Sequence, residues 1–176
     1  MAELIMTYFG HGEKFGVHIE YSMEDRPMGT IAPLKLLKDL PENFLTMNGD
    51  ILTDIDFMDL YDYHIKSGAL ATVGCYQRRV DIDFGVMEIR DNEVIGFREK
   101  PHQDYSVSMG VYVFNKKILE YVPEQRPFGF DDLMLKLLEE KQRINAYLFK
   151  GYWMDIGRPG DFEKANQDMA EGVFVV

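Results

Sequence analysis

Hydrophobic and polar positions follow two different periods along the chain, and each period predicts one kind of element. Alternation or a short apolar run predicts strands over Val17–Met23, Asn43–Met47, Ala69–Gln77, Gly85–Ile89, Glu93–Phe97, Ser106–Phe114, Ile144–Phe149 and Tyr152–Ile156. Helical spacing predicts helices over Thr30–Leu40, Asp56–Ser67, Asp131–Lys141 and Arg158–Gly172. Strands and helices mostly alternate, which predicts an α/β fold with a mostly parallel sheet.

Short polar signals mark where several of these elements begin, turn or end. The helix over Asp56–Ser67 can be capped by Asp54 or Asp56, and Gly68 is suited to end it. The segment Arg90-Asp91-Asn92 lies between two predicted strands and indicates a β-hairpin. The sheet therefore carries a hairpin insertion near the middle of the chain.

Length and composition predict a single domain over residues 1–176. The sequence contains no repeat, low-complexity segment or Gly/Ser/Pro-rich linker. No apolar run approaches the roughly 18 residues that a membrane span requires, and Met1–Gly10 lacks the features of a secretory signal. The single cysteine, Cys75, lies in an apolar run and is expected to be a buried thiol in a reducing compartment. We therefore expect a cytoplasmic protein with no membrane partner.

The net charge of −11 changes the range of expected ligands. It argues against a nucleic-acid partner, because such binding depends on cationic contacts to phosphates. An acidic protein that handles smaller phosphate compounds needs a divalent cation between its carboxylates and the ligand. If the substrates are phosphates, carboxylates that hold magnesium are therefore expected.

The first candidate carboxylate is Asp50, in Asn48-Gly49-Asp50 directly after the apolar run Asn43–Met47. In open α/β sheets, ligands bind outside the carboxyl ends of strands, where this aspartate is expected. The alternative is an ordinary turn, since Asn-Gly and Gly-Asp are common turn dipeptides.

The second candidate carboxylate is Asp155, between Trp153, Met154 and Ile156. Such apolar neighbours predict partial desolvation, which is unfavourable for an aspartate without a partner or a metal ion. The alternative is a carboxylate satisfied by a lysine or by backbone N–H groups. Asp50 and Asp155 are far apart in sequence, so only the fold decides whether they meet. If they do, the pair suits magnesium, which combines a few carboxylates with phosphate oxygens and water.

Two further segments carry chemistry that a phosphorylated sugar or a nucleotide could use. Glu99-Lys100-Pro101 offers one acceptor and one cation for a hydroxyl and a phosphate, although the segment by itself is better explained as a solvated loop pair. Pro27-Met28-Gly29-Thr30 precedes a predicted helix, where backbone N–H groups can bind an anion or a base edge. Thr30 as a plain helix cap is the alternative.

These motifs follow one another over nearly the whole chain in a definite order. They are Tyr8-Phe9-Gly10-x-Gly12-x-x-Phe15-Gly16-Val17-x-Ile19-x-Tyr21, Pro27-Met28-Gly29-Thr30, Asn48-Gly49-Asp50, Phe84-Gly85-Val86, Phe97-x-Glu99-Lys100-Pro101, Gly110-Val111-Tyr112-x-Phe114, Tyr152-Trp153-x-Asp155-Ile156-Gly157 and Ala165-Asn166. The series resembles the sugar-1-phosphate nucleotidyltransferases, which include glucose-1-phosphate thymidylyltransferases and mannose-1-phosphate or heptose-1-phosphate guanylyltransferases. The resemblance implies a Rossmann-like nucleotidyltransferase fold with its N-terminal βαβ portion missing.

The resemblance also implies a reaction and a set of site residues. A sugar 1-phosphate attacks the α-phosphorus of a nucleoside triphosphate, and a nucleotide sugar and pyrophosphate form. By matching motif, Asp50 and Asp155 would hold Mg²⁺, and Lys100 would contact the sugar phosphate. The other implied substrate-binding positions are Glu99 and Gly85 toward the sugar, Gly29 and Thr30 toward the base, and Gly110.

One departure from the family pattern bears on activity. The family's glycine-rich triphosphate loop with its arginine has no counterpart in residues 1–176. We therefore expect this chain alone to show little turnover, and a non-catalytic relative that binds a sugar phosphate or a partner is the alternative. A glycosyltransferase is disfavoured, because Asp50-Ile51-Leu52 lacks the Asp-x-Asp pairing that such enzymes use for metal. The sheet edge left by the missing strand makes a homo-oligomer a further hypothesis.

Overall fold

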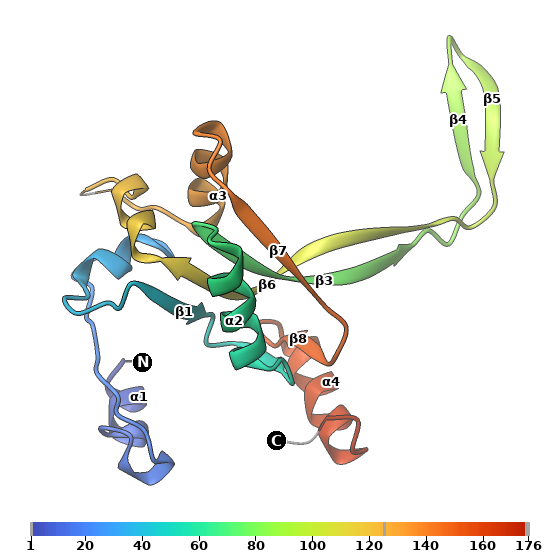
Figure 1. The fold of residues 1–176 in the computed structure, drawn as a ribbon. Helices are drawn as coiled ribbons and strands as arrows, with labels where there is room; N and C mark the ends of the chain where they lie inside the picture. Colours follow the sequence, from blue (N-terminus) through green and yellow to red (C-terminus); the bar gives the residue numbers. More distant parts are fainter. Residues whose placement is uncertain (1, 125, 175–176) are drawn as a thin grey trace. The chain divides into compact units, whose positions relative to one another are not determined.

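The computed structural model describes residues 2–124 and 126–174, which form two compact units. The first unit contains Met1–Leu40 and Lys117–Lys141, and the second contains Pro41–Lys116 and Gln142–Val176 (Figure 1). Both units are therefore built from two stretches of chain. The prediction of one domain over residues 1–176 stays a prediction.

The first unit is helical. Its elements are α1 (Ala2–Phe9), η1 (Glu13–Phe15), η2 (Ala32–Leu36), η3 (Lys116–Tyr121, whose first residue belongs to the second unit) and α3 (Phe130–Glu139). The predicted strand over Val17–Met23 is wrong, because the described residues provide no strand to pair with it. The helix predicted over Thr30–Leu40 is only the short 3₁₀ turn η2. Pro33 lies in its first turn, and Pro41 favours an extended residue before it.

The second unit contains the sheet. A mixed sheet has the order β1-β6-β3-β7, from β1 (Asn43–Met47), β6 (His102–Asn115), β3 (Ala71–Asp81) and β7 (Ile144–Phe149). Short β2 (Ile51–Thr53) pairs with β8 (Trp153–Asp155), and β4 (Val86–Arg90) pairs with β5 (Glu93–Arg98). The α/β class and the mixed sheet are confirmed. Only the β3–β7 pair is parallel among the described strands, so parallel pairs are a minority.

One helix covers the sheet, and its ends are fixed by the predicted signals. Helix α2 spans Phe57–Ser67. The Asp56 carboxylate accepts hydrogen bonds from the backbone N–H groups of Met58 and Asp59, at 2.9 and 3.0 Å. Gly68 ends the helix with φ +62°, a conformation that glycine adopts without steric cost.

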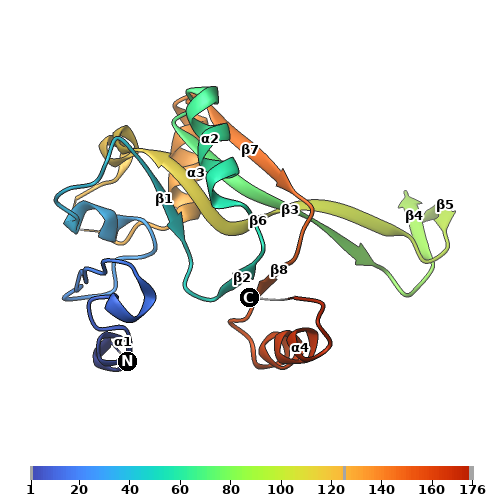
Figure 2. The same cartoon turned by 60° about the horizontal axis from the view of Figure 1, so that its bottom comes forward.

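The core of the second unit lies between α2, the centre of β6 and the segment around β2. Its buried members are Ile51, Ile55, Leu60, Met109, Val111 and Val113, and Trp153 packs against them. Figures 1 and 2 show α2 beside β6, and Figure 2 shows β2 beside β8. This core therefore supports the chain just after β1 and at β8, the two places where the candidate carboxylates occur.

A buried histidine joins α2 to the sheet. The Nδ1 atom of His64 lies 2.8 Å from Thr72 Oγ1, and its Nε2 atom lies 3.2 Å from Asn43 Oδ1. Desolvation by burial lowers the pKa of His64 below its ordinary value of 6.5. The imidazole is therefore neutral near neutral pH and acts as a polar crosslink within the unit.

Strands β3 and β6 continue beyond the sheet as a two-stranded ribbon that ends in the β4–β5 hairpin (Figure 1). The predicted hairpin is confirmed. Asp91 and Asn92 form its turn with φ +48° and +67°, as two-residue hairpin turns require. Apolar side chains on the hairpin, including Met87 and Phe97, are more than half exposed. The hairpin is therefore held by strand pairing and lacks a core of its own.

The final helix follows β8 directly. Helix α4 spans Pro159–Ala170, with Pro159 in its first turn as the sequence predicted. Its buried Asp168 accepts a hydrogen bond from the Tyr152 hydroxyl at 3.0 Å and lies 3.3 Å from Lys164 Nζ. Burial and this hydrogen bond raise the pKa of Tyr152 to about 12. The Tyr152–Asp168 hydrogen bond ties α4 to the chain just before β8.

Candidate active site

The two candidate carboxylates lie on neighbouring stretches of backbone. Strands β2 and β8 are antiparallel, with Ile51 opposite Asp155. Beyond this pair, the backbone N–H of Ile156 donates a 2.9 Å hydrogen bond to the carbonyl of Asp50. The pairing of two short strands therefore brings together two aspartates that are remote in sequence.

The carboxylates of these aspartates face the same point in space. A Cβ atom built on Gly157 would lie 3.1 Å from Asp50 Oδ2 and 3.1 Å from Asp155 Oδ1. The backbone N–H of Gly157 donates a 2.9 Å hydrogen bond to Asp155 Oδ1. Gly157 therefore leaves open the space between the carboxylates and orients one of them.

The donor chemistry of this pair fits a magnesium ion. Both aspartates are exposed, so the partial desolvation expected for Asp155 is wrong. Among the described residues, no group of three or more His, Cys, Asp or Glu side chains gathers at one point. Magnesium keeps several waters and is commonly held by one or two carboxylates together with substrate phosphates. Two exposed carboxylates with solvent around them match that preference.

Hydrogen bonds behind the carboxylates hold the two loops in place. The backbone N–H of Asn48 donates to the carbonyl of Gly110 at 2.9 Å, and the Trp153 indole N–H donates to the carbonyl of Met109 at 2.9 Å. Gly110 has φ +74°, and a Cβ atom on it would lie 2.9 Å from the Asn48 side-chain amide. A larger side chain at position 110 would therefore clash with Asn48, which explains the glycine there.

Three of the other predicted site residues lie on the hairpin arm, which consists of β4, β5 and the residues that join them to β3 and β6 (82–101). Gly85 faces Glu99, since a Cβ atom on Gly85 would lie 3.3 Å from Glu99 Oε2 and 2.5 Å from the Phe97 ring. Lys100 follows with φ +40° and an exposed side chain. Figures 1 and 2 show this hairpin at the outer end of the β3–β6 ribbon, away from β8, which pairs with β2. The structure therefore brings Gly85, Glu99 and Lys100 together, but apart from the carboxylates.

The remaining predicted residues, Gly29 and Thr30, belong to the first unit and make packing contacts there. A Cβ atom on Gly29, which has φ +86°, would lie 2.8 Å from the carbonyl oxygen of Phe128. The Thr30 hydroxyl accepts a 3.0 Å hydrogen bond from the backbone N–H of Phe130. Thr30 thus binds the first residue of α3 and does not cap the turn that follows it in sequence.

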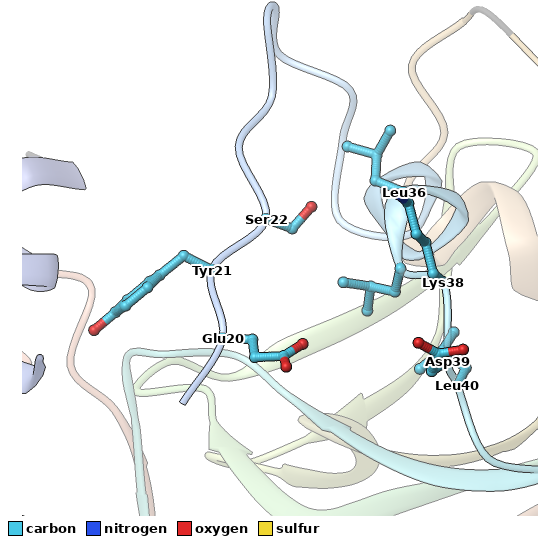
Figure 3. Close-up of a pocket in the computed structure, with 8 residues that line it drawn as sticks. Glu20, Tyr21, Ser22, Leu36, Lys38, Asp39 and Leu40 are labelled. Carbon is cyan, nitrogen blue, oxygen red and sulfur yellow. The ribbon is translucent and has the colours of Figure 1, made fainter. Parts of the chain in front are cut away.

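The first unit also contains a hollow of about 370 Å³, lined by Glu20–Ser22 and Leu36–Leu40. Figure 3 shows the Tyr21 ring directed away from the other lining side chains. Its hydroxyl donates to the carbonyl of Gly10 at 2.6 Å. Glu20 and Asp39 contribute like charges to the hollow. Tyr21 belongs to the first family motif, but its hydroxyl is engaged by Gly10, so we assign the hollow no role.

Sequence reasoning missed three residues around Asp155. Gly157 appeared only as part of a motif, although it faces both carboxylates. Arg78 and Arg158 line a cleft beside Asp155, and neither was singled out as a ligand-binding residue. The signal available in the sequence was the position of Arg158, directly after the Asp155-Ile156-Gly157 motif. For Arg78, only the fold provides the signal.

Comparison with known proteins places this chain in a family. The family model described as "Nucleotidyl transferase" matches residues 1–172, and the chain belongs to this family. The chain is 32% identical over 170 residues to D-glycero-alpha-D-manno-heptose 1-phosphate guanylyltransferase of Aneurinibacillus thermoaerophilus, covering 95% of this chain and 74% of the relative. It is 30% identical over 168 residues to mannose-1-phosphate guanyltransferase of Candida albicans.

The shared length differs between these relatives. The match to the Candida albicans protein covers 90% of this chain but 46% of the relative, so the chain spans about half of that protein. Among solved structures, HddC from Yersinia pseudotuberculosis is similar in fold, with a TM-score of 0.68 and 22% identity. That match covers 96% of this chain and 74% of HddC. The Rossmann-like nucleotidyltransferase fold implied by the motifs is confirmed.

Within residues 2–124 and 126–174, every helix is too short or too polar to span a bilayer.

Proposed function

We propose that this chain carries the metal-binding part of a sugar-1-phosphate nucleotidyltransferase site, with Asp50 and Asp155 as the ligands of one Mg²⁺ ion. The observation that carries the proposal is the shared approach of both carboxylates to the space beside Gly157. Family membership and the names of the relatives support the reaction class. Both named relatives are guanylyltransferases, which favours GTP as the nucleotide.

The proposed reaction is an in-line displacement. A phosphate oxygen of the sugar 1-phosphate bonds to the α-phosphorus of the triphosphate, the bond from that phosphorus to the β-phosphate oxygen breaks, and pyrophosphate leaves. A bound magnesium ion would neutralise the charge that gathers on these phosphates. Asp50 and Asp155 would fix the ion, while the 2.9 Å bond from Gly157 N–H would orient the Asp155 carboxylate.

The roles of the other predicted residues remain part of the proposal. Lys100 would contact the sugar phosphate, and Glu99 and Gly85 would contact the sugar, once the hairpin arm and the carboxylates meet on a bound substrate. Gly29 and Thr30 would lie against the base, and Gly110 would line the substrate site. We expect little turnover from residues 1–176 alone, since they contain no glycine-rich triphosphate loop.

The test is titration with Mn²⁺, a paramagnetic substitute for Mg²⁺, followed by the electron paramagnetic resonance signal of the free ion. Asp50→Asn and Asp155→Asn should each weaken Mn²⁺ binding by at least about tenfold, because each removes one charged ligand. Mg²⁺ should compete for the same site.

Asp62→Asn is the matched control. Asp62 is exposed on α2, and no hydrogen bond or ion pair joins its carboxylate to another described residue. This change should leave Mn²⁺ binding unaltered. Equal weakening in all three variants would indicate a general effect of negative charge and would contradict the proposed site. Mannose 1-phosphate binding without any specific Mn²⁺ binding would instead favour the non-catalytic relative.

A further inference from the structure

A charged cleft of about 290 Å³ opens beside Asp155 in the second unit. Three cationic side chains line it: Arg78 from β3, Arg158 before α4 and Lys164 from α4. Two stretches of chain that are remote in sequence, β3 and the region of α4, therefore concentrate cationic side chains at one place. This contrasts with the net charge of −11 for the whole chain.

The two guanidinium groups are available to a ligand. No hydrogen bond or ion pair joins the side chain of Arg78 or Arg158 to another of the described residues. The adjacent Arg79 differs, because its Nε atom lies 3.3 Å from Asp104 Oδ1. Lys164 is partly engaged by Asp168 at 3.3 Å. Two uncommitted like charges in one small cleft repel each other, and an anion between them relieves that repulsion.

The rest of the lining defines the size and character of the ligand group. Tyr76 and Trp153 form an aromatic wall with ring centroids 5.3 Å apart. Trp153 is fixed by its hydrogen bond to the carbonyl of Met109. The cleft volume lies near the lower end of the range for ligand pockets, roughly 300–1,000 Å³. The space therefore suits a phosphate group and part of what it is attached to, and is too small for a whole nucleotide sugar.

We propose that Arg78 and Arg158, assisted by Lys164, bind a phosphate group of a substrate or product directly beside the Asp50–Asp155 pair. Guanidinium groups present two parallel N–H donors that match phosphate oxygens, and such charge-assisted bonds are stronger than neutral ones. The source of the phosphate, a sugar 1-phosphate or pyrophosphate, rests on the proposed function. The proposal that an anion binds here is supported by the residues that line the cleft and does not depend on the proposed function.

This assignment adds to the role predicted for Lys100. Lys100 lies on the hairpin arm, whereas Asp155 is one of the residues that line the cleft. Asp155 and Asp161 also line the cleft and oppose an anion there. A divalent cation on Asp155 removes part of that opposition. Mg²⁺ and the phosphate group should therefore bind with positive coupling, each strengthening the affinity of the other.

The experiment is isothermal titration of the chain with pyrophosphate and, separately, with mannose 1-phosphate, first in EDTA and then in Mg²⁺. At least one probe should bind in EDTA, and Mg²⁺ should tighten it. The double variant Arg78→Gln/Arg158→Gln should weaken that binding by on the order of 10- to 100-fold, as expected for lost charge-assisted hydrogen bonds. The probe that binds more tightly identifies the source of the phosphate.

Arg79→Gln is the control, because it removes a neighbouring arginine that is already paired with Asp104. It should leave the affinity unchanged. Arg158→Lys keeps the charge but loses the paired donors, so its affinity should fall between those of wild type and the double variant. Absence of binding for both probes, or binding that survives the double variant, would overturn the proposal. Mn²⁺ binding in the same samples reports separately on the carboxylate site, so failure of one does not imply failure of the other.

Discussion

The segments around Asp50 and Asp155 and the hairpin arm carry equally recognisable sequence motifs. They differ in the packing that holds each of them in place. Asp50 directly precedes β2 and Asp155 ends β8, beside a core in which Met109 and Leu60 are fully buried. Glu99 and Lys100 lie at the base of a hairpin whose Met87 is 54% exposed. A site residue is positioned by the core behind it. The structure therefore brings the proposed metal ligands together and leaves the residues proposed to contact the sugar on an arm.

The largest expected effect is on the free energy of unfolding. Replacing a methionine by alanine in each region tests whether the two regions differ in core packing. Met109→Ala should lower the free energy of unfolding by about 2–5 kcal/mol, because it opens a cavity in a closed core. Met87→Ala should change it by less than about 0.5 kcal/mol, since that side chain is mostly solvated. Urea denaturation followed by circular dichroism measures both. Similar losses for the two variants would show that the arm has a core of its own.

A smaller effect tests the space between the carboxylates. Gly157→Ala places a methyl group 3.1 Å from an oxygen of each aspartate, so Mn²⁺ binding should weaken by about tenfold. Gly160→Ala is the matched control, since a Cβ atom there meets no atom within 4 Å. Calorimetric titration with Mn²⁺ would distinguish the variants. Unchanged affinity in Gly157→Ala would place the ion away from this gap.

The smallest effect concerns the pH dependence of the sheet that supports the carboxylates. His64 has a lowered pKa in the folded state, so the unfolded chain takes up its proton first, near pH 6.5. The unfolding free energy should therefore fall as pH drops below 6.5 and level off once the folded histidine is protonated, with a slope of at most about 1.4 kcal/mol per pH unit. His64→Asn should remove this contribution. Parallel stability curves for wild type and variant between pH 5 and 7 would contradict it.

Local signals predicted the elements that are stabilised locally. Asp56 and Gly68 set the ends of α2, and the turn at Asp91-Asn92 set the hairpin. The segment Val17–Met23 has a strand pattern but no pairing partner among the described residues, so its pattern was insufficient. Strand formation depends on a second segment as much as on the first.

The candidate site, like the fold, was predictable only in part from the sequence. The pairing of Ile51 with Asp155 joins segments remote in sequence, so no pattern within either segment could reveal that Asp50 and Asp155 meet. The order of the family motifs gave that expectation. The cleft formed by Arg78 and Arg158 had no such motif, and its members meet only because β3 and the start of α4 border it together.

Anomalous diffraction from crystals of this chain grown with Mn²⁺ tests the central claim most directly. The proposed function predicts one manganese peak in the gap beside Gly157, with oxygens of both Asp50 and Asp155 about 2.1 Å from it. A manganese ion bound by other groups, or carboxylates turned away from each other in the presence of the ion, would contradict it.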